Sequence, residues 1–241
     1  MHSIPLPRIG VLGGMGPLAT ADFLAKLVQA TPALRDQDHF PVTVESAPQI
    51  PDRISALEGR GEDPLPALVA VARRLADAGC DLIAMPCNTA HLWHASLSAR
   101  TTVPILHIAD AVAARLGGAR TVGLIGTTAT LASKLFPDRI GGAVGWLQPD
   151  DAQMSRQVMP GVAAVKRGDM AQASALLLPV VRDLAARGAQ TIVLACTEIP
   201  LVVSAADVAV PLIDATEALA LATIAEAVRL RDRGTGVRKV A

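Results

Sequence analysis

The sequence predicts an α/β fold with two similar Rossmann-like halves, each built on a parallel sheet, related by pseudo-twofold symmetry and separated by a cleft. Three observations predict it. Short β-branched runs alternate with helical patterns, which favours parallel strands joined by helices. Sequence markers recur in the same order in both parts of the chain. Finally, two apolar runs, at 81–85 and 191–195, each lead into a cysteine followed by small polar residues.

The internal repeat rests on three pairs of markers. The glycine-bounded run at 10–13 (GVLG) matches 123–126 (GLIG), Cys87 matches Cys196, and the Val-Pro pair at 103–104 matches 210–211. The spacing within each pair is nearly constant at about 110 residues. We therefore expect an N-terminal half at 1–110 and a C-terminal half at 111–214. A helix at 215–230 should pack back on the first half, and 231–241 should be a frayed polar tail.

Hydrophobic periodicity and glycine or proline punctuation give the individual elements. Pro17 suits a first helical turn, where its missing N–H would be unpaired anyway, and Pro160 and Pro179 should break or kink their helices. Residues 47–60 read as a loop with a helical turn after it. We expect strands at 8–13, 40–46, 81–85, 103–108, 121–126, 142–147, 191–195 and 210–213, and helices at 18–30, 65–78, 89–98, 109–116, 128–135, 154–166, 170–186 and 216–230.

Composition excludes several classes of function. The chain has 241 residues, 51% of them hydrophobic, and no net charge, so nothing favours nucleic acid or an anionic membrane as a partner. No apolar run approaches the roughly 18 residues of a spanning helix. The first residues lack the pattern of a signal peptide. Three cysteines are too few for a disulfide framework, so we expect a cytoplasmic protein.

The two cysteines that end strands carry the chemical argument. In an open parallel sheet, ligands bind at the carboxyl ends of the strands. Cys87 and Cys196 hold equivalent places in the two halves, so we expect them to face one site from two sides. One thiolate could take a proton from the carbon beside a carboxylate while the opposite thiol returns one. Helices beginning after each cysteine should lower the pKa of both thiols.

A carboxylate site should accompany the thiols. Backbone N–H groups at the expected helix starts, together with Asn88, Thr89, Thr127 and Thr197, suit a carboxylate and the enolate-like charge that develops on it. The scheme needs neither a cofactor nor a metal. No PLP lysine pattern, G-x-G-x-x-G fingerprint, Walker loop or zinc-ligand spacing is found in the sequence.

Simpler interpretations apply to several of these residues. Cys80 reads as a small core residue, and the threonines at 127 and 130 could only cap a helix. His91 reads as structural or as a neighbour of the site. His39, His94 and His107 have no partner spacing and read as surface or core residues.

Three segments carry a resemblance to a known family: GVLGGMGPLAT at 10–20, PCNTAH at 86–91 and ACTEIPL at 195–201, with PDR at 51–53. Over residues 8–230 the chain resembles the aspartate/glutamate racemase family, and within it the aspartate racemase branch. The resemblance implies a cofactor-independent racemase with two α/β domains, an active site between them and a homodimeric assembly. It implies an amino-acid substrate and no metal.

The resemblance also assigns roles to residues. Cys87 and Cys196 become the acid/base pair, and Arg53 and Lys166 match the basic pair that binds the side-chain carboxylate of aspartate. Glutamate racemases of the family carry Asp-Ser where this chain has Gly13-Gly14, and histidine where it has Glu198, which disfavours glutamate. The residues implied for the amino and carboxylate groups of the substrate are Met15, Asn88, Thr89, Thr127, Thr130, Thr197 and Glu198.

The sequence hypothesis is therefore a racemase that interconverts L- and D-aspartate by proton transfer between two cysteines. Three alternatives stay open. The enzyme could racemise glutamate or a broader set of amino acids. It could isomerise or decarboxylate a dicarboxylate, a reaction that often relies on one of the two cysteines. It could also be a relative that binds small carboxylates without turnover.

Overall fold

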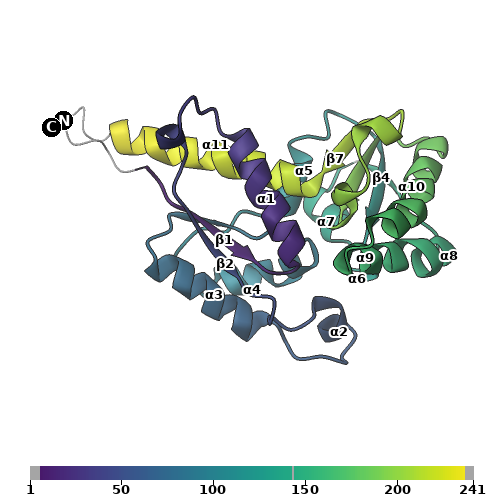
Figure 1. Ribbon diagram of the computed structural model, residues 1–241, viewed down its shortest axis with the longest axis horizontal. Coiled ribbons are helices and arrows are strands. Elements are labelled where there is room, and N and C mark those ends of the chain that lie inside the picture. The colour runs from purple at the N-terminus through teal and green to yellow at the C-terminus, as the bar shows by residue number, and fades with distance from the viewer. Residues whose placement is uncertain (1–5, 143, 237–241) are drawn as a thin grey trace.

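Two parallel sheets form the framework of the computed structural model, which describes residues 6–142 and 144–236 (Figure 1). The first sheet has the strand order β2-β1-β3, and the second has the order β5-β4-β6-β7. The strands of the first sheet are β1 (Ile9–Gly13), β2 (Val42–Ser46) and β3 (Leu82–Ala84); those of the second are β4 (Thr121–Gly126), β5 (Gly145–Leu147), β6 (Thr191–Ala195) and β7 (Leu212–Asp214).

The sheets confirm the fold class and repeat the same strand order. β1, β2 and β3 occupy the places that β4, β5 and β6 occupy in the second sheet. The Val-Pro markers are also equivalent in space. The Ile83 N–H donates to the Pro104 carbonyl at 2.8 Å, and the Ile192 N–H donates to the Pro211 carbonyl at 3.0 Å. Each Val-Pro segment therefore lies against the strand that leads to a cysteine.

The strand expected at 103–108 is wrong in its extent. Only an isolated parallel bridge, between Ile83 and Ile105, forms there. Pro104 has no N–H to donate to a ladder, and helix α5 begins at Ile108, capped by His107, whose ring accepts the Ala109 N–H at 3.2 Å. The cap turns the chain out of the sheet. The strand expected at 142–147 is shorter, at Gly145–Leu147, and Ala143 lies outside the described residues.

Helices connect the strands, and several of them differ from expectation. The helix expected at 89–98 opens as a 3-10 helix at 89–93, and a further helix at 135–140 was not expected. Pro160 lies in the first turn of α9, where it needs no hydrogen bond, and a π-helical turn (η3) precedes it. Pro179 lies inside α10, which continues through it as one helix. The helices are α1 (Pro17–Ala30), η1 (Asp36–Asp38), α2 (Arg53–Leu57), α3 (Leu65–Asp77), η2 (Thr89–Trp93), α4 (His94–Ser98), α5 (Ile108–Ala113), α6 (Thr128–Ala132), α7 (Leu135–Ile140), α8 (Asp151–Gln153), η3 (Met154–Val158), α9 (Met159–Lys166), α10 (Met170–Ala186), η4 (Ile199–Leu201), η5 (Ala205–Asp207) and α11 (Ala215–Gly236).

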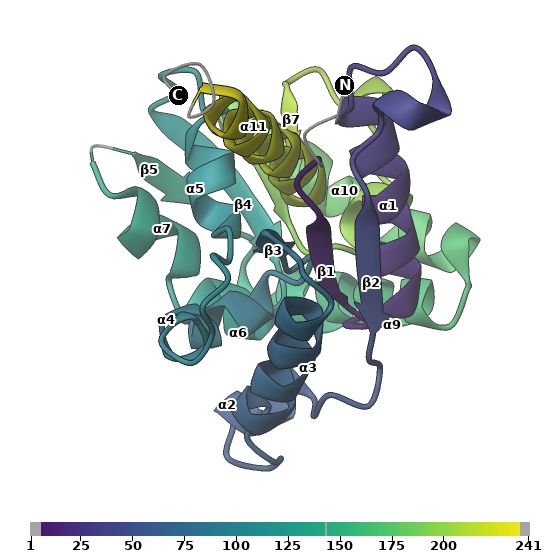
Figure 2. The same cartoon turned by 90° about the vertical axis from the view of Figure 1, so that its left-hand side faces the viewer.

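Helix α11 returns to the first half of the chain. It packs against α1 and α5, and Figure 2 shows it between these two helices. It also runs past the expected end at 230 to Gly236, so part of the expected tail is helical. Residues 237–241 lie outside the described residues. Because α11 follows β7 directly, it ties the second sheet to the helices of the first.

One hydrophobic core spans both halves. It joins Phe23 of α1 and Ile108 of α5 to Leu124 of β4, Val193 of β6 and Leu219 of α11, all of them fully buried. A smaller core fills the other face of the first sheet, beneath α3. The burial of this much apolar surface holds the two sheets at a fixed relation.

A partly buried ion pair supports the joint between the halves. Lys26 of α1 pairs with Asp22 on the same helix and with Asp214 at the end of β7. Burial alone would lower the pKa of Lys26, but the two carboxylates outweigh it and the pKa is raised. The lysine is therefore charged, and it links the first half to the last strand of the second.

No helix in the described ranges 6–142 and 144–236 has both the length and the apolar composition needed to cross a membrane.

Candidate active site

A pocket lies where strands of both sheets end. Met15 follows β1, Cys87 follows β3, Thr127 follows β4 and Cys196 follows β6. The carboxyl ends of parallel strands are the expected ligand site of such sheets. The residues lining the pocket are Met15, Asp52, Arg53, Ile54, Cys87, Asn88, Thr89, Thr127, Lys166, Ala195, Cys196, Thr197 and Glu198.

Cys87 lies in the turn after β3. Its N–H donates to the Met85 carbonyl at 2.8 Å, and the side chain is 6% exposed. Burial raises the pKa of the Cys87 thiol; the Arg53 cation and the Ala90 N–H lower it in part, and Glu198 raises it. The Cys87 thiol therefore resists ionisation, although the Arg53 cation partly offsets the effect of burial.

Cys196 directly follows β6 and contacts a carboxylate. Its Sγ–H donates to Oε2 of Glu198 at 3.0 Å, and the Thr197 hydroxyl donates to the same oxygen at 3.1 Å. Burial and the Glu198 charge raise the pKa of Cys196 well above its usual value, while Lys166 lowers it in part. The Cys196 thiol therefore holds its proton firmly.

The expectation of lowered thiol pKa values is wrong for both cysteines. Short 3-10 helices follow them, η2 after Cys87 and η4 after Cys196, so each thiol faces few aligned backbone dipoles. Burial opposes the thiolate more strongly than these N–H groups favour it. A consequence is that either thiolate, once formed, is a stronger base than an exposed one.

Three threonine hydroxyls join the two halves beside the pocket. Thr89 from the first half contacts Thr127 at 3.1 Å and Thr130 at 2.9 Å, and the latter two are 3.0 Å apart. Thr127 also caps α6 by accepting the Thr130 N–H at 3.2 Å. Thr130 is fully buried behind the pocket and does not line it. The capping role and the pocket-facing role are thus combined at Thr127.

Buried polar atoms without partners mark the interior of the pocket. Within the described residues, neither amide atom of Asn88 makes a hydrogen bond, and neither does Nε of Arg53. Arg53 is held by Nη1, which donates to the carbonyls of Ile50 at 3.2 Å and Pro51 at 3.0 Å. Because unpaired buried polar groups are costly, these atoms are suited to bind a polar ligand.

The remaining predicted residues also reach the pocket. Met15 is carried by the glycine loop after β1, where Gly14 has a φ of +92° and a Cβ would lie 2.4 Å from the Ala47 nitrogen. Lys166, at the end of α9, lines the pocket although its side chain is exposed. Every predicted site residue except Thr130 therefore lines one pocket.

Sequence reasoning missed three lining residues, Asp52, Ile54 and Ala195. Asp52 caps α2 by accepting the Ser55 N–H at 2.8 Å. Burial would raise its pKa, but the bonds from Ser55 and the charges of Arg53 and Lys166 outweigh this and lower it. Asp52 directly precedes Arg53 in the 51–53 loop, and this position could have identified it as a pocket residue from the sequence.

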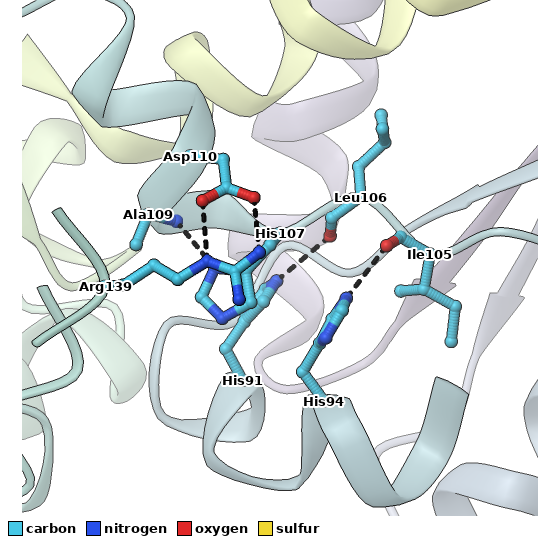
Figure 3. A network of polar contacts seen from close by, with 8 residues as sticks. All are labelled: His91, His94, Ile105, Leu106, His107, Ala109, Asp110 and Arg139. Carbon is cyan, nitrogen blue, oxygen red and sulfur yellow. Dashed lines mark hydrogen bonds and ion pairs between the residues drawn. The ribbon is translucent and has the colours of Figure 1, made fainter. Parts of the chain in front are cut away.

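Figure 3 shows a cluster of three histidines, one of which is bonded to the Cys87 backbone. The ring centroids of His91, His94 and His107 are 4.7 to 5.9 Å apart. His91 Nδ1 donates to the Cys87 carbonyl at 2.9 Å, and His94 Nε2 donates to the Ile105 carbonyl at 2.8 Å. The sequence did not predict this cluster because His107 comes from a different segment.

The surroundings of His91 and His107 keep these two rings neutral. Burial, with the nearby His107, lowers the pKa of His91 to about 3, and burial lowers that of His107 to about 4. Arg139, paired with Asp110 at 2.7 Å, adds a positive charge beside His107. In the described part of the chain no group of three or more His, Cys, Asp or Glu side chains is arranged to hold a metal ion. The cluster thus fastens the Cys87 turn to the 105–108 segment.

Comparison with known proteins identifies the family. The family profile described as Asp/Glu/Hydantoin racemase matches residues 12–223. The chain belongs to this family. The family and the relatives described next indicate that the protein is an isomerase, specifically an amino-acid racemase.

Three relatives illustrate the similarity of this racemase to known proteins. The structure of Picrophilus torridus aspartate racemase has a TM-score of 0.85 at 34% identity, covering 92% of this chain and 94% of that one. The broad specificity amino-acid racemase RacX of Bacillus subtilis is 26% identical over 90% of this chain and 96% of its own. A glutamate racemase of Deinococcus radiodurans is 31% identical, over 82% of this chain and 67% of its own length.

We predict that the free energy of unfolding of this racemase falls as pH decreases from 6.5 towards 3, because the unfolded chain protonates His91 while the folded chain does not. At pH 5 the loss from His91 is about 2 kcal/mol. Urea denaturation at pH 7 and pH 5 measures it. A His91→Asn variant, which keeps a donor for the Cys87 carbonyl, should show a smaller difference; an equal difference would exclude His91 as the source. The partly buried His39, which lies outside the histidine cluster, provides the matched control, because His39→Asn removes a histidine and leaves the cluster intact.

Proposed function

We propose that the protein interconverts L- and D-aspartate without a cofactor, using Cys87 and Cys196 as its acid and base. The observation that carries the proposal is that two thiols from equivalent positions of the two halves line one pocket. A racemase must take a proton from one face of the substrate and return one to the other, and two thiols from different sheets in one pocket suit that need.

The reaction follows from the surroundings of the thiols. One thiolate takes the Cα proton, the opposite thiol releases its own proton to the other face of the carbon, and the two sulfurs exchange states. Negative charge builds up on the substrate carboxylate meanwhile. Hydroxyls of Thr89 and Thr127 and the buried, unpartnered amide of Asn88 are available to stabilise it. Burial makes each thiolate a stronger base for this weakly acidic proton.

The preference for aspartate rests on the basic pair. Arg53, with its unpartnered Nε, and Lys166 lie at one side of the pocket, suited to a second carboxylate. The similarity to Picrophilus torridus aspartate racemase supports the same substrate. The similarity to RacX supports the alternative, a broader range of amino acids.

The decisive experiment is incubation of the purified protein with L-aspartate in D2O, followed by chiral chromatography and mass spectrometry. We expect D-aspartate carrying one deuterium at Cα. Cys87→Ser and Cys196→Ser should each abolish inversion. Cys80→Ala is the matched control, since Cys80 is buried outside the pocket. Activity that survives either serine substitution would exclude the two-thiol mechanism, and failure to invert aspartate alongside inversion of other amino acids would favour the broader range.

The role of the basic pair is tested by Lys166→Met. We expect kcat/KM for aspartate to fall about tenfold to a hundredfold, the value of a hydrogen bond to a charged group, and kcat/KM for any neutral amino acid the enzyme accepts to change little. Lys134→Met is the matched control, because Lys134 is exposed and outside the pocket. An equal loss for aspartate and neutral amino acids would contradict recognition of the side-chain carboxylate.

We also propose that the protein is a homodimer, as the family resemblance implies. We propose a cytoplasmic location because the three free cysteines suit a reducing compartment. Sedimentation equilibrium should give twice the mass of one chain, and a monomer at micromolar concentration would contradict the dimer. Fractionation of cells should recover the protein with cytoplasmic markers.

A further inference from the structure

Glu198 contacts a thiol inside the pocket, although the resemblance assigns it to the substrate. Its side chain is 5% exposed, and its Oε2 accepts hydrogen bonds from Cys196 Sγ at 3.0 Å and from Thr197 Oγ1 at 3.1 Å. An oxygen that accepts two such bonds suits a carboxylate. The other oxygen, Oε1, faces the Gly16 loop, where a Cβ would lie 3.6 Å from it. The hydrogen bonds of Oε2 therefore fix the carboxylate against the cysteine turn.

The two thiols consequently differ in their charged neighbours. Cys87 faces the Arg53 cation, which favours its thiolate, whereas Cys196 faces the Glu198 carboxylate, which opposes it. Lys166 acts on Cys196 in the opposite direction from Glu198. The remaining charged residue that lines the pocket, Asp52, is occupied by the Ser55 N–H and lies next to Arg53.

We propose that Glu198 is a positioning residue that holds the proton on Cys196, so that in the free enzyme Cys196 is the acid and Cys87 is the first thiol to ionise. The catalytic meaning of this inference rests on the proposed function, because it fixes which thiol acts as base in the resting enzyme. The order of ionisation itself does not depend on turnover.

The arrangement also accounts for the return of the enzyme to its resting state. When Cys196 gives its proton to the substrate carbon, its S–H bond breaks, a C–H bond forms and a thiolate is left 3.0 Å from the Glu198 carboxylate. Two anions at this distance repel each other strongly in a buried site. Cys196 therefore recovers a proton from solvent readily, while Cys87 releases to solvent the proton it took.

The test measures alkylation of each cysteine by iodoacetamide as a function of pH, resolved by peptide mass spectrometry on the full-length protein. In the unmodified protein Cys87 should react with a lower midpoint pH than Cys196. In Glu198→Gln the midpoint of Cys196 should fall by about one pH unit or more, since the anion beside it is gone. Glu198→Asp keeps the charge and should keep the order, and Glu62→Gln is the matched exposed control.

Two results would overturn the inference: an unchanged Cys196 midpoint in a folded Glu198→Gln variant, with folding checked by circular dichroism, or equal shifts of both cysteines. If Glu198→Gln does not fold, Cys196 reacting at or below the midpoint of Cys87 in the unmodified protein would also overturn it. Because alkylation needs no substrate, absence of aspartate racemisation would contradict the proposed function and leave this result standing.

Racemisation gives an independent readout. In Glu198→Gln, the pH at which kcat/KM declines on the alkaline side should move lower, because Cys196 loses its proton earlier. The loss in kcat/KM should be the same for L- and D-aspartate, since the equilibrium constant between enantiomers is one. An unmoved alkaline limb would contradict the inference.

Discussion

The burial of two thiols between two sheets is the constraint on which the site depends. Neither half of the chain forms this pocket by itself, because Cys87 follows a strand of the first sheet and Cys196 follows a strand of the second. The shared core from Phe23 through Leu124 to Leu219 holds the sheets together. The threonine hydroxyls of Thr89, Thr127 and Thr130 then fix the two strand ends against each other at hydrogen-bonding distance. Packing sets the distance between the halves, and polar contacts set their register.

Burial has opposite effects on the thiols and on the substrate-facing groups. It raises the pKa of both cysteines, and that of Cys196 further because the Glu198 carboxylate lies beside it. It also leaves the Asn88 amide and Arg53 Nε unpaired, which is a cost that a bound carboxylate would relieve. The exclusion of water from the pocket therefore favours binding of a polar ligand by the unpaired groups, and it makes each thiolate a stronger base. The proposed chemistry uses both.

The sequence predicted most of the strands and helices, because hydrophobic periodicity and the glycine and proline residues at element ends largely determine them. The repeat of glycine run, cysteine and Val-Pro pair corresponds to two sheets of the same strand order. The failures have different causes. The strand at 103–108 is shortened by a local contact, the cap that His107 makes with the next helix. The histidine cluster was missed because it brings His107 to His91 from a different segment. The pKa direction of the cysteines was likewise missed, since it depends on burial depth and on Glu198.

Helix α11 has a consequence for how the protein is made. The helix belongs in space to α1 and α5, but in sequence it follows the whole second half. During synthesis the ribosome must therefore release β4 through β7 before the first half acquires its covering helix. Until then, the apolar faces of α1 and α5 lack a partner. The duplicated halves thus cannot mature one after the other, and the pocket between them forms as a late event of the whole chain.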